Sequence, residues 1–148
     1  MNLIHVESPH YATHEEKGKT QPTLTRKSSI LLFDSGGRST KEILTIFLDK
    51  ESKESAHFVI DQDGTTYQTI PEEYVALHHE DSTSLGVLIS NETILTDKQI
   101  EALMALCTIF CIRYHIPLNR VVGDVADFPW YEFLNALGAN VADGELRE

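Results

Sequence analysis

The chain has 148 residues, a length that suits one domain with a hydrophobic core of ordinary size. Hydrophobic residues make up 41% and charged residues 24%, as in a globular protein rather than a disordered one. Twelve Lys and Arg against 23 Asp and Glu give a net charge of −11, which repels phosphate backbones and anionic lipids. We therefore predict a single domain over residues 1–148, with no nucleic acid and no membrane among its partners. The charge needs no role beyond solubility.

The N-terminal residues and the cysteines predict a cytoplasmic protein. His5 and Glu7 interrupt the first apolar run, and no basic segment precedes it, so a signal peptide is not expected. No stretch approaches the roughly 20 apolar residues that a membrane span requires. Cys107 and Cys111 lie within an apolar helical pattern, so we expect reduced core side chains rather than a disulfide or a metal-binding pair.

The first part of the chain predicts an arm, a strand and a helix. Residues 9–27 are polar, and we predict a long surface loop or irregular arm there. Residues 28–33 (SSILLF) form a short apolar run that predicts a strand buried on both faces. A DSGG turn follows, and Ser39 and Glu42 then have the spacing of a capping box. The apolar residues of the next turn give this helix a buried face.

The middle of the chain predicts three strands. Residues 57–60 and 65–70 are rich in β-forming residues, and the sequence DQDG at 61–64 between them is a hairpin signal. Residues 84–90 (SLGVLIS) read as a further buried strand.

The last part of the chain predicts two helices around one strand. Thr96 and Gln99 form a second capping box. The helix that follows carries one apolar stripe, made of Ile100, Leu103, Met104, Cys107, Phe110, Cys111 and Tyr114. Residues 119–123 predict a short strand, and a final helix begins near Pro129 and ends at Gly138. The whole order, β-α-β-β-β-α-β-α, predicts an α/β (α+β) fold with a mixed central sheet flanked by helices.

A long segment in the middle of the chain resembles a known family. The sequence ESKESAHFVIDQDGTTYQTIPEEYVALHH, matching from Glu51 to His78, is similar to the central segment of N-acetylmuramoyl-L-alanine amidases, which reads like eSkvSaHyvIdrdGtiyqlvpe followed by AwH. The sequences HVESPHY, LTDKQIEALMAL, IPLNRVVG and FPWYEFL also resemble that family, in the same order and at nearly the same spacing. The resemblance covers nearly the whole chain and implies the zinc amidase, or peptidoglycan-recognition-like, fold.

The resemblance also implies a chemistry. Members of the family cleave the amide bond between N-acetylmuramic acid and L-alanine. Two histidines and an Asp or Cys hold a zinc ion with one open position, where the metal polarises the scissile carbonyl and activates a water molecule. A Glu or Tyr takes up the proton, and a basic residue completes the site.

This sequence departs from the family at the catalytic positions. Phe33 stands where the first zinc histidine closes the strand ivlHyT, Ala56 where the family has the tyrosine of YHF, and Leu88 where it has the glutamate of SIGIElvN. The second histidine, in vvGHsDvAP, is missing from VVGDVADFPW, and the loop that carries the third ligand is reduced to Asp127. Because zinc needs several lone-pair donors around one point, we predict no zinc and no other cofactor.

Five polar residues near the lost site remain candidates for ligand binding. His57 and His78 stand at positions that face the active-site cleft in the family, although ordinary hydrogen-bonded histidines would explain them as well. Asp34, Asp124 and Asp127 could gather around the old metal position and, with a histidine, bind a hard cation such as magnesium or calcium. Asp34 is equally explained as a turn former, and Asp124 as a solvated loop residue.

Three kinds of function remain open. The leading hypothesis is a catalytically inactive amidase-like protein, a pseudo-amidase that binds a muropeptide-like ligand, another small molecule or a protein partner. The alternative is an active N-acetylmuramoyl-L-alanine amidase with a rebuilt, non-standard site. A structural or assembly subunit is the third, and a large exposed apolar patch or a symmetric dimer would identify it. The sequence names neither the ligand nor the oligomeric state.

Overall fold

The structure of the protein is a computed structural model. The model describes residues 2–6, 8, 13–16, 19–22, 26–49, 51–52, 54–77 and 83–146. The elements are β1 (Leu3–His5), β2 (Thr13–Glu16), β3 (Lys19–Pro22), β4 (Ser29–Asp34), α1 (Thr40–Leu48), β5 (Phe58–Ile60), β6 (Thr66–Gln68), β7 (Ser84–Ile89), α2 (Asp97–Tyr114), the 3-10 helix η1 (Leu118–Arg120), β8 (Val121–Asp124) and α3 (Trp130–Leu146).

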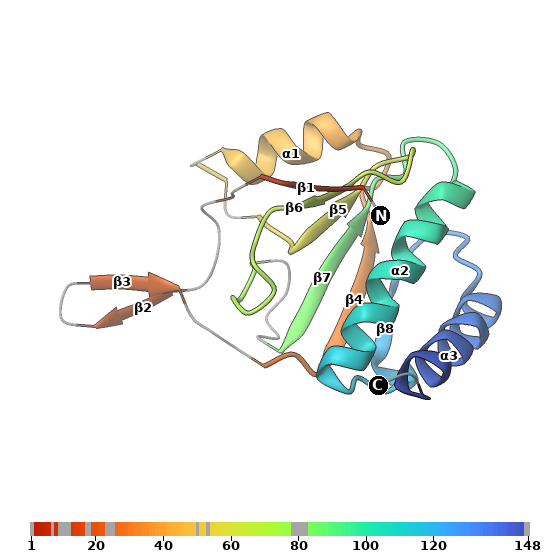
Figure 1. The fold of residues 1–148 in the computed structure, drawn as a ribbon. Helices are drawn as coiled ribbons and strands as arrows, with labels where there is room; N and C mark the ends of the chain where they lie inside the picture. The colour runs from red at the N-terminus through yellow and green to blue at the C-terminus, as the bar shows by residue number, and fades with distance from the viewer. Residues whose placement is uncertain are drawn as a thin grey trace.

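A central mixed sheet organises the molecule (Figure 1). Its strands among the described residues run in the order β1-β6-β5-β7-β4-β8, and β5 and β6 are antiparallel while the other neighbours are parallel. The antiparallel pair is the predicted hairpin, in which the Asp61 N–H donates to Thr65 O at 2.8 Å and Gly64 adopts a φ of +88°. The sheet carries helices on both faces, which confirms the predicted fold class.

Alternate residues of the central strands face two separate hydrophobic cores, one on each side of the sheet. In β5, Phe58 and Ile60 face α2 and belong to the larger core between the sheet and the helices α2 and α3. Val59 faces the opposite side and packs with α1 in a smaller core. Because side chains of a strand alternate between its faces, β4, β5 and β7 contribute to both cores. The α1 face and the α2 face of the sheet are therefore two distinct surroundings for functional side chains.

Both predicted capping boxes are present. The Glu42 N–H donates to the Ser39 hydroxyl at 3.2 Å, and the Gln99 N–H donates to the Thr96 hydroxyl at 3.1 Å. Gln99 has a second role that its motif does not indicate. Its side chain is fully buried, and its amide donates to the carbonyls of Ile60 and Ser90, so the start of α2 is joined to the ends of β5 and β7.

The structure corrects the prediction for the last helix. α3 does not end at Gly138 but continues to Leu146. A side chain at Gly138 would begin 3.0 Å from the Leu118 Cδ1, and one at Gly144 would begin 2.5 Å from the Ile112 Cδ1. These glycines therefore allow α3 to pack closely against η1 and α2, and neither of them caps the helix.

The N-terminal region also differs from the prediction. The arm expected to be irregular contains the antiparallel strands β2 and β3, and Figure 1 shows that this hairpin projects away from the central sheet. β1, which was not predicted, forms one edge of the central sheet and pairs with β6. Neither segment has the apolar alternation that a half-buried strand shows in its sequence. Among the described residues, no helix combines the length and the hydropathy that a bilayer crossing demands.

The two cysteines are buried side chains of α2, as predicted, and the described structure gives them as free thiols. Burial raises the pKa of Cys111 to about 11, and it raises the pKa of Cys107 further. Since the thiolate is the reactive form, both thiols of the folded protein are expected to resist a disulfide reagent at pH 8. Both should react at once after unfolding in guanidinium chloride. A fast-reacting thiol in the folded protein would contradict the burial of this helix face.

Candidate functional site

Register places the three apolar replacements on neighbouring strands. Phe33 of β4 lies opposite Leu88 of β7, and Leu88 lies opposite Val59 of β5. Ala56 lies two residues before the first residue of β5 and is fully buried. The three positions that the family resemblance assigns to a zinc histidine, a tyrosine and a glutamate therefore share one region, on the α1 face of the sheet.

These positions belong to an apolar cluster, which we call the α1 cluster. Its buried members are Ile43, Phe47, Ala56, Val59 and Leu88, with Phe33, Leu44, Ile46 and Tyr67 packed against them. Zinc in proteins is bound by imidazole nitrogen, thiolate sulfur or carboxylate oxygen. The phenyl, methyl and isobutyl groups at positions 33, 56 and 88 have no such donor, so these residues do not fit a zinc ion.

The Asp34 carboxylate is engaged by two backbone groups. Oδ1 accepts a hydrogen bond from the Gly36 N–H at 3.0 Å, within the turn that follows β4. Oδ2 accepts from the Ala126 N–H at 2.9 Å, in the segment between β8 and α3. Asp34 therefore forms its predicted turn and also ties two segments 92 residues apart, at the carboxyl end of the parallel strands.

The other two candidate aspartates, Asp124 and Asp127, are exposed near the same carboxyl end of the parallel strands. Asp124 lies opposite Phe33 in the pairing of β8 with β4, and Asp127 adopts a left-handed φ of 58°. His78 lies outside the described residues. Within the described part of the chain, no three His, Cys, Asp or Glu side chains come together in a group that could hold a metal ion.

His57 is a buried histidine with both ring nitrogens hydrogen-bonded. It is 0% exposed, its Nδ1 accepts from the Gly86 N–H at 3.0 Å, and its Nε2 lies 2.6 Å from Tyr74 O. Because Nδ1 is an acceptor, we assign the ring proton to Nε2, which donates to the Tyr74 carbonyl. The ring thus links β7 to the segment 71–77.

Lys27 is a buried residue that the sequence analysis missed. It closes the polar run that was predicted to lie at the surface, yet it is 1% exposed. Its Nζ donates to Tyr74 O at 2.9 Å, the same carbonyl that His57 contacts. A lysine in a polar run gives no sequence signal of burial. Only the fold shows that Lys27 and His57 together hold the segment 71–77.

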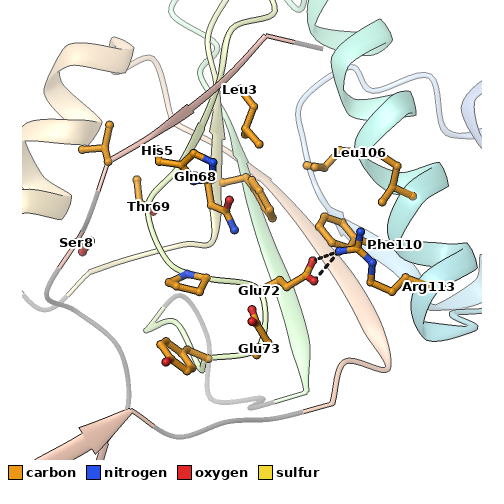
Figure 2. A pocket seen from close by; sticks show the side chains of 15 residues that line it. Leu3, His5, Ser8, Gln68, Thr69, Glu72, Glu73, Leu106, Phe110 and Arg113 are labelled. Atoms are coloured by element: carbon orange, nitrogen blue, oxygen red, sulfur yellow. Dashed lines mark hydrogen bonds and ion pairs between the residues drawn. The ribbon is translucent and has the colours of Figure 1, made fainter.

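A cavity lies on the other face of the sheet. It has a volume of about 560 Å³ and lies between α2, the segment 71–74 and the strands β1 and β6. Figure 2 shows Gln68 and Glu72 on one side of it and Leu106 and Phe110 on the other. We call it the α2-face cavity. Its volume is in the range of small-molecule sites.

One ion pair closes part of this cavity. Two Glu72 oxygens lie 2.5 and 2.7 Å from Arg113 Nη1, and the Arg113 guanidinium lies 5.3 Å from the centre of the Phe110 ring (Figure 2). Burial, together with the nearby Glu72 carboxylate, raises the pKa of the Tyr114 hydroxyl to about 12. No sequence pattern predicts this ion pair, because Glu72 and Arg113 are 41 residues apart and belong to no motif.

Structural comparisons support the assignment of the fold. A mutant endolysin from Bacillus subtilis is 16% identical, with 95% of this chain and 98% of that chain covered and a TM-score of 0.68. The amidase LysC from Clostridium intestinale URNW is 18% identical, with coverages of 93% and 98% and a TM-score of 0.66. The amidase AmiD from E. coli, solved with anhydro-N-acetylmuramic acid-L-Ala-D-gamma-Glu-L-Lys, is 20% identical, with coverages of 82% and 61% and a TM-score of 0.67.

Sequence comparison gives the family. No curated protein sequence gave a significant match. The sequence model of the N-acetylmuramoyl-L-alanine amidase family, in contrast, matches residues 5–132, which is most of the chain. With the mixed sheet, the helices on both faces and the similarity to solved amidases, this match leads to one conclusion. The chain belongs to the N-acetylmuramoyl-L-alanine amidase family.

Proposed function

We propose that this member of the amidase family is a binding protein that does not hydrolyse peptidoglycan. Its ligand would be a muropeptide-like or other small molecule, or a protein partner. The observation that carries the proposal is the α1 cluster. Phe33, Ala56 and Leu88 pack with α1 in an apolar core at the positions where the family resemblance calls for catalytic groups.

The chemistry of the remaining donors supports the same proposal. Amidase chemistry on this scaffold needs a group that polarises the scissile carbonyl and a base that takes a proton from water. Asp34 already accepts hydrogen bonds from the N–H groups of Gly36 and Ala126, and both ring nitrogens of His57 are engaged inside the core. Neither side chain can turn toward a substrate without losing buried or turn-forming contacts.

Metal analysis combined with an amidase assay tests the proposal. Protein purified without chelator is expected to contain far less than one zinc per chain, and to release no stem peptide from muropeptides. Added zinc should not change this result. A family member with its complete ligand set, assayed in parallel, controls for the substrate. Stoichiometric zinc together with turnover that a chelator abolishes would overturn the proposal.

The alternative is an active amidase with a rebuilt site. The group of aspartates at the carboxyl ends of β4 and β8 favours it. Asp34 and Asp124 lie near each other at the ends of β4 and β8, beside the position of Phe33. If this edge were catalytic, the Asp124→Asn and Asp127→Asn variants would each lose activity. Asp97→Asn, at the exposed start of α2, serves as the matched control and should keep it.

Calorimetry then addresses the ligand. Titration with muropeptides that contain the N-acetylmuramoyl–L-alanine linkage is expected to give binding without product formation. Affinity-purified partners are the second arm of the experiment. Absence of any binding to muropeptides would leave the protein-partner form of the proposal and reject the muropeptide form.

A further inference from the structure

We propose that the protein forms a symmetric dimer in which the edge strand β1 pairs, in the antiparallel direction, with β1 of a second copy. β1 is the last strand on one side of the central sheet, and among the described residues no strand lies beyond it (Figure 1). An open edge of this kind is a template for a further strand. The pairing uses backbone groups of β1 alone, so the inference does not depend on whether the chain is an amidase.

The outward backbone groups of β1 belong to Leu3 and His5. On the inner side, the Asn2 carbonyl accepts a hydrogen bond from β6 at 2.8 Å, and the Val6 N–H donates one to β6 at 2.9 Å. Successive residues of a strand direct their backbone groups to opposite sides, so Ile4 also faces β6. The N–H and C=O groups of Leu3 and His5 therefore point away from the sheet. No hydrogen bond within the described part of the chain satisfies them.

These outward groups are self-complementary about a two-fold axis. When Ile4 lies opposite Ile4 of the second copy, Leu3 of each copy lies opposite His5 of the other. Each of the two Leu3–His5 pairs then exchanges two N–H···O bonds, because the outward-facing residues of an antiparallel pair bond reciprocally. This register uses every outward N–H and C=O group of β1 and closes the dimer, which is why a second copy fits this edge.

The side chains of β1 also suit an interface. Leu3 and Ile4 are 37% and 40% exposed, and they point to opposite faces of the strand. Sheet edges that stay unpaired are commonly guarded by charged residues, proline or a bulge. Positions 2–6 (NLIHV) contain no Lys, Arg, Asp, Glu or Pro, and the register of β1 with β6 is uninterrupted. The opposite edge strand, β8, follows Arg120 directly and ends at Asp124.

The second copy also contributes to the α2-face cavity. Leu3 and His5 both line this cavity (Figure 2). The two-fold axis between antiparallel strands is perpendicular to the sheet, so the α2 faces of the two copies lie on the same side. His5 of the second copy then stands beside Leu3 at the mouth of the cavity. Dimerisation thus covers an exposed leucine and places the cavities of the two copies next to each other.

Sedimentation equilibrium of the whole chain tests the proposal. Four hydrogen bonds and a few apolar side chains place the interface at the low end of the size range, so we expect a Kd of roughly 1–100 µM. Because each copy carries a net charge of −11, added salt should screen the repulsion and strengthen the dimer. A chain that stays monomeric up to about 1 mM, or a dimer that salt weakens, would overturn the proposal.

A matched pair of lysine variants identifies the edge. Ile4→Lys places two ammonium groups opposite each other at the two-fold axis and is expected to raise the Kd at least about tenfold. Val122→Lys is the control, since Val122 is 46% exposed and lies on the opposite edge strand β8. It should leave the Kd unchanged. Dimerisation lost in Val122→Lys and kept in Ile4→Lys would assign the contact to β8 and refute the proposal. Circular dichroism verifies that both variants are folded.

A cysteine variant locates the axis. Residues opposite each other in a non-hydrogen-bonded antiparallel pair have Cα atoms about 4.5 Å apart, within the reach of a disulfide. Mild oxidation of Ile4→Cys is expected to give a covalent dimer, whereas Val122→Cys should stay monomeric; Cys107 and Cys111 are buried. Equal cross-linking of the two variants, or none in Ile4→Cys, would reject the register. Neither experiment reads zinc content or muropeptide hydrolysis, so failure of the proposed function leaves both results standing.

Discussion

Replacement of Gly123 by alanine is expected to destabilise the protein by at least about 4 kcal/mol, among the largest effects of any single substitution. Gly123 lies in β8, opposite Leu32 of the central strand β4, with a φ of +154°. A Cβ at this position would lie 1.8 Å from Leu32 O and 2.7 Å from Leu32 C, both of them backbone atoms. Backbone of a central strand cannot move aside without breaking the pairing of β4 with β8.

Thermal unfolding measures this effect, and the expected loss corresponds to roughly 10 °C in Tm for a chain of this size. Gly37→Ala is the matched control. Gly37 also has a positive φ, +88°, but nothing lies within 4 Å of the Cβ that alanine would add. It should therefore cost only the backbone penalty of about 1 kcal/mol. Equal Tm values for the two variants would contradict the close approach of β8 to β4.

Replacement of His57 by alanine is the second large effect, with an expected loss of about 3 to 5 kcal/mol. The substitution removes the acceptor of the Gly86 N–H and the donor to Tyr74 O, and it leaves a cavity where a fully buried ring stood. The Gly86 N–H would then be a buried donor without its partner. Urea unfolding monitored by circular dichroism gives the change in free energy.

The control for this prediction keeps one of the two hydrogen bonds. In His57→Asn the side-chain oxygen can occupy the place of Nδ1 and accept from the Gly86 N–H, so the loss should be clearly smaller than for His57→Ala. Substitution of His5, an exposed histidine of β1, by alanine should stay within about 0.5 kcal/mol. If His57→Ala were as stable as His5→Ala, the structural role assigned to the buried ring would be wrong.

The His57→Ala substitution is also expected to affect the α2-face cavity, although His57 does not line it. His57 and Lys27 both contact the carbonyl of Tyr74, and the segment around Tyr74 lines the cavity. Loss of one anchor is therefore expected to loosen this wall. His57 is a positioning residue for the cavity and does not itself line it among the described residues.

Interactions between residues close in the sequence could be predicted from the sequence. Each capping box joins two residues three positions apart, and the hairpin that contains DQDG joins β5 to β6 through the five residues 61–65. The energies of such contacts depend on local geometry that the residue types themselves specify. The helical stripe of α2 was predictable for the same reason, because a period of 3.6 residues follows from helix geometry alone.

Contacts between distant segments could not be predicted in this way. The sequence placed a helix end at Gly138, since glycine commonly follows helices, yet the tertiary structure uses Gly138 as a close contact with Leu118. Lys27 looked like a surface residue and is buried at Tyr74 O. In both cases the neighbour that decides the role of the residue lies more than 15 positions away in the chain.

The same distinction between local and distant contacts applies to the candidate site. The sequence by itself determined the chemistry of positions 33, 56 and 88, because the absence of a lone-pair donor is a property of Phe, Ala and Leu wherever they lie. Only the tertiary structure decided that these side chains share the α1 cluster, because strand register sets which residues meet on one face of the sheet. The α2-face cavity and its Glu72–Arg113 pair likewise exist only because α2 packs beside the segment 71–74, and no local pattern encodes that packing.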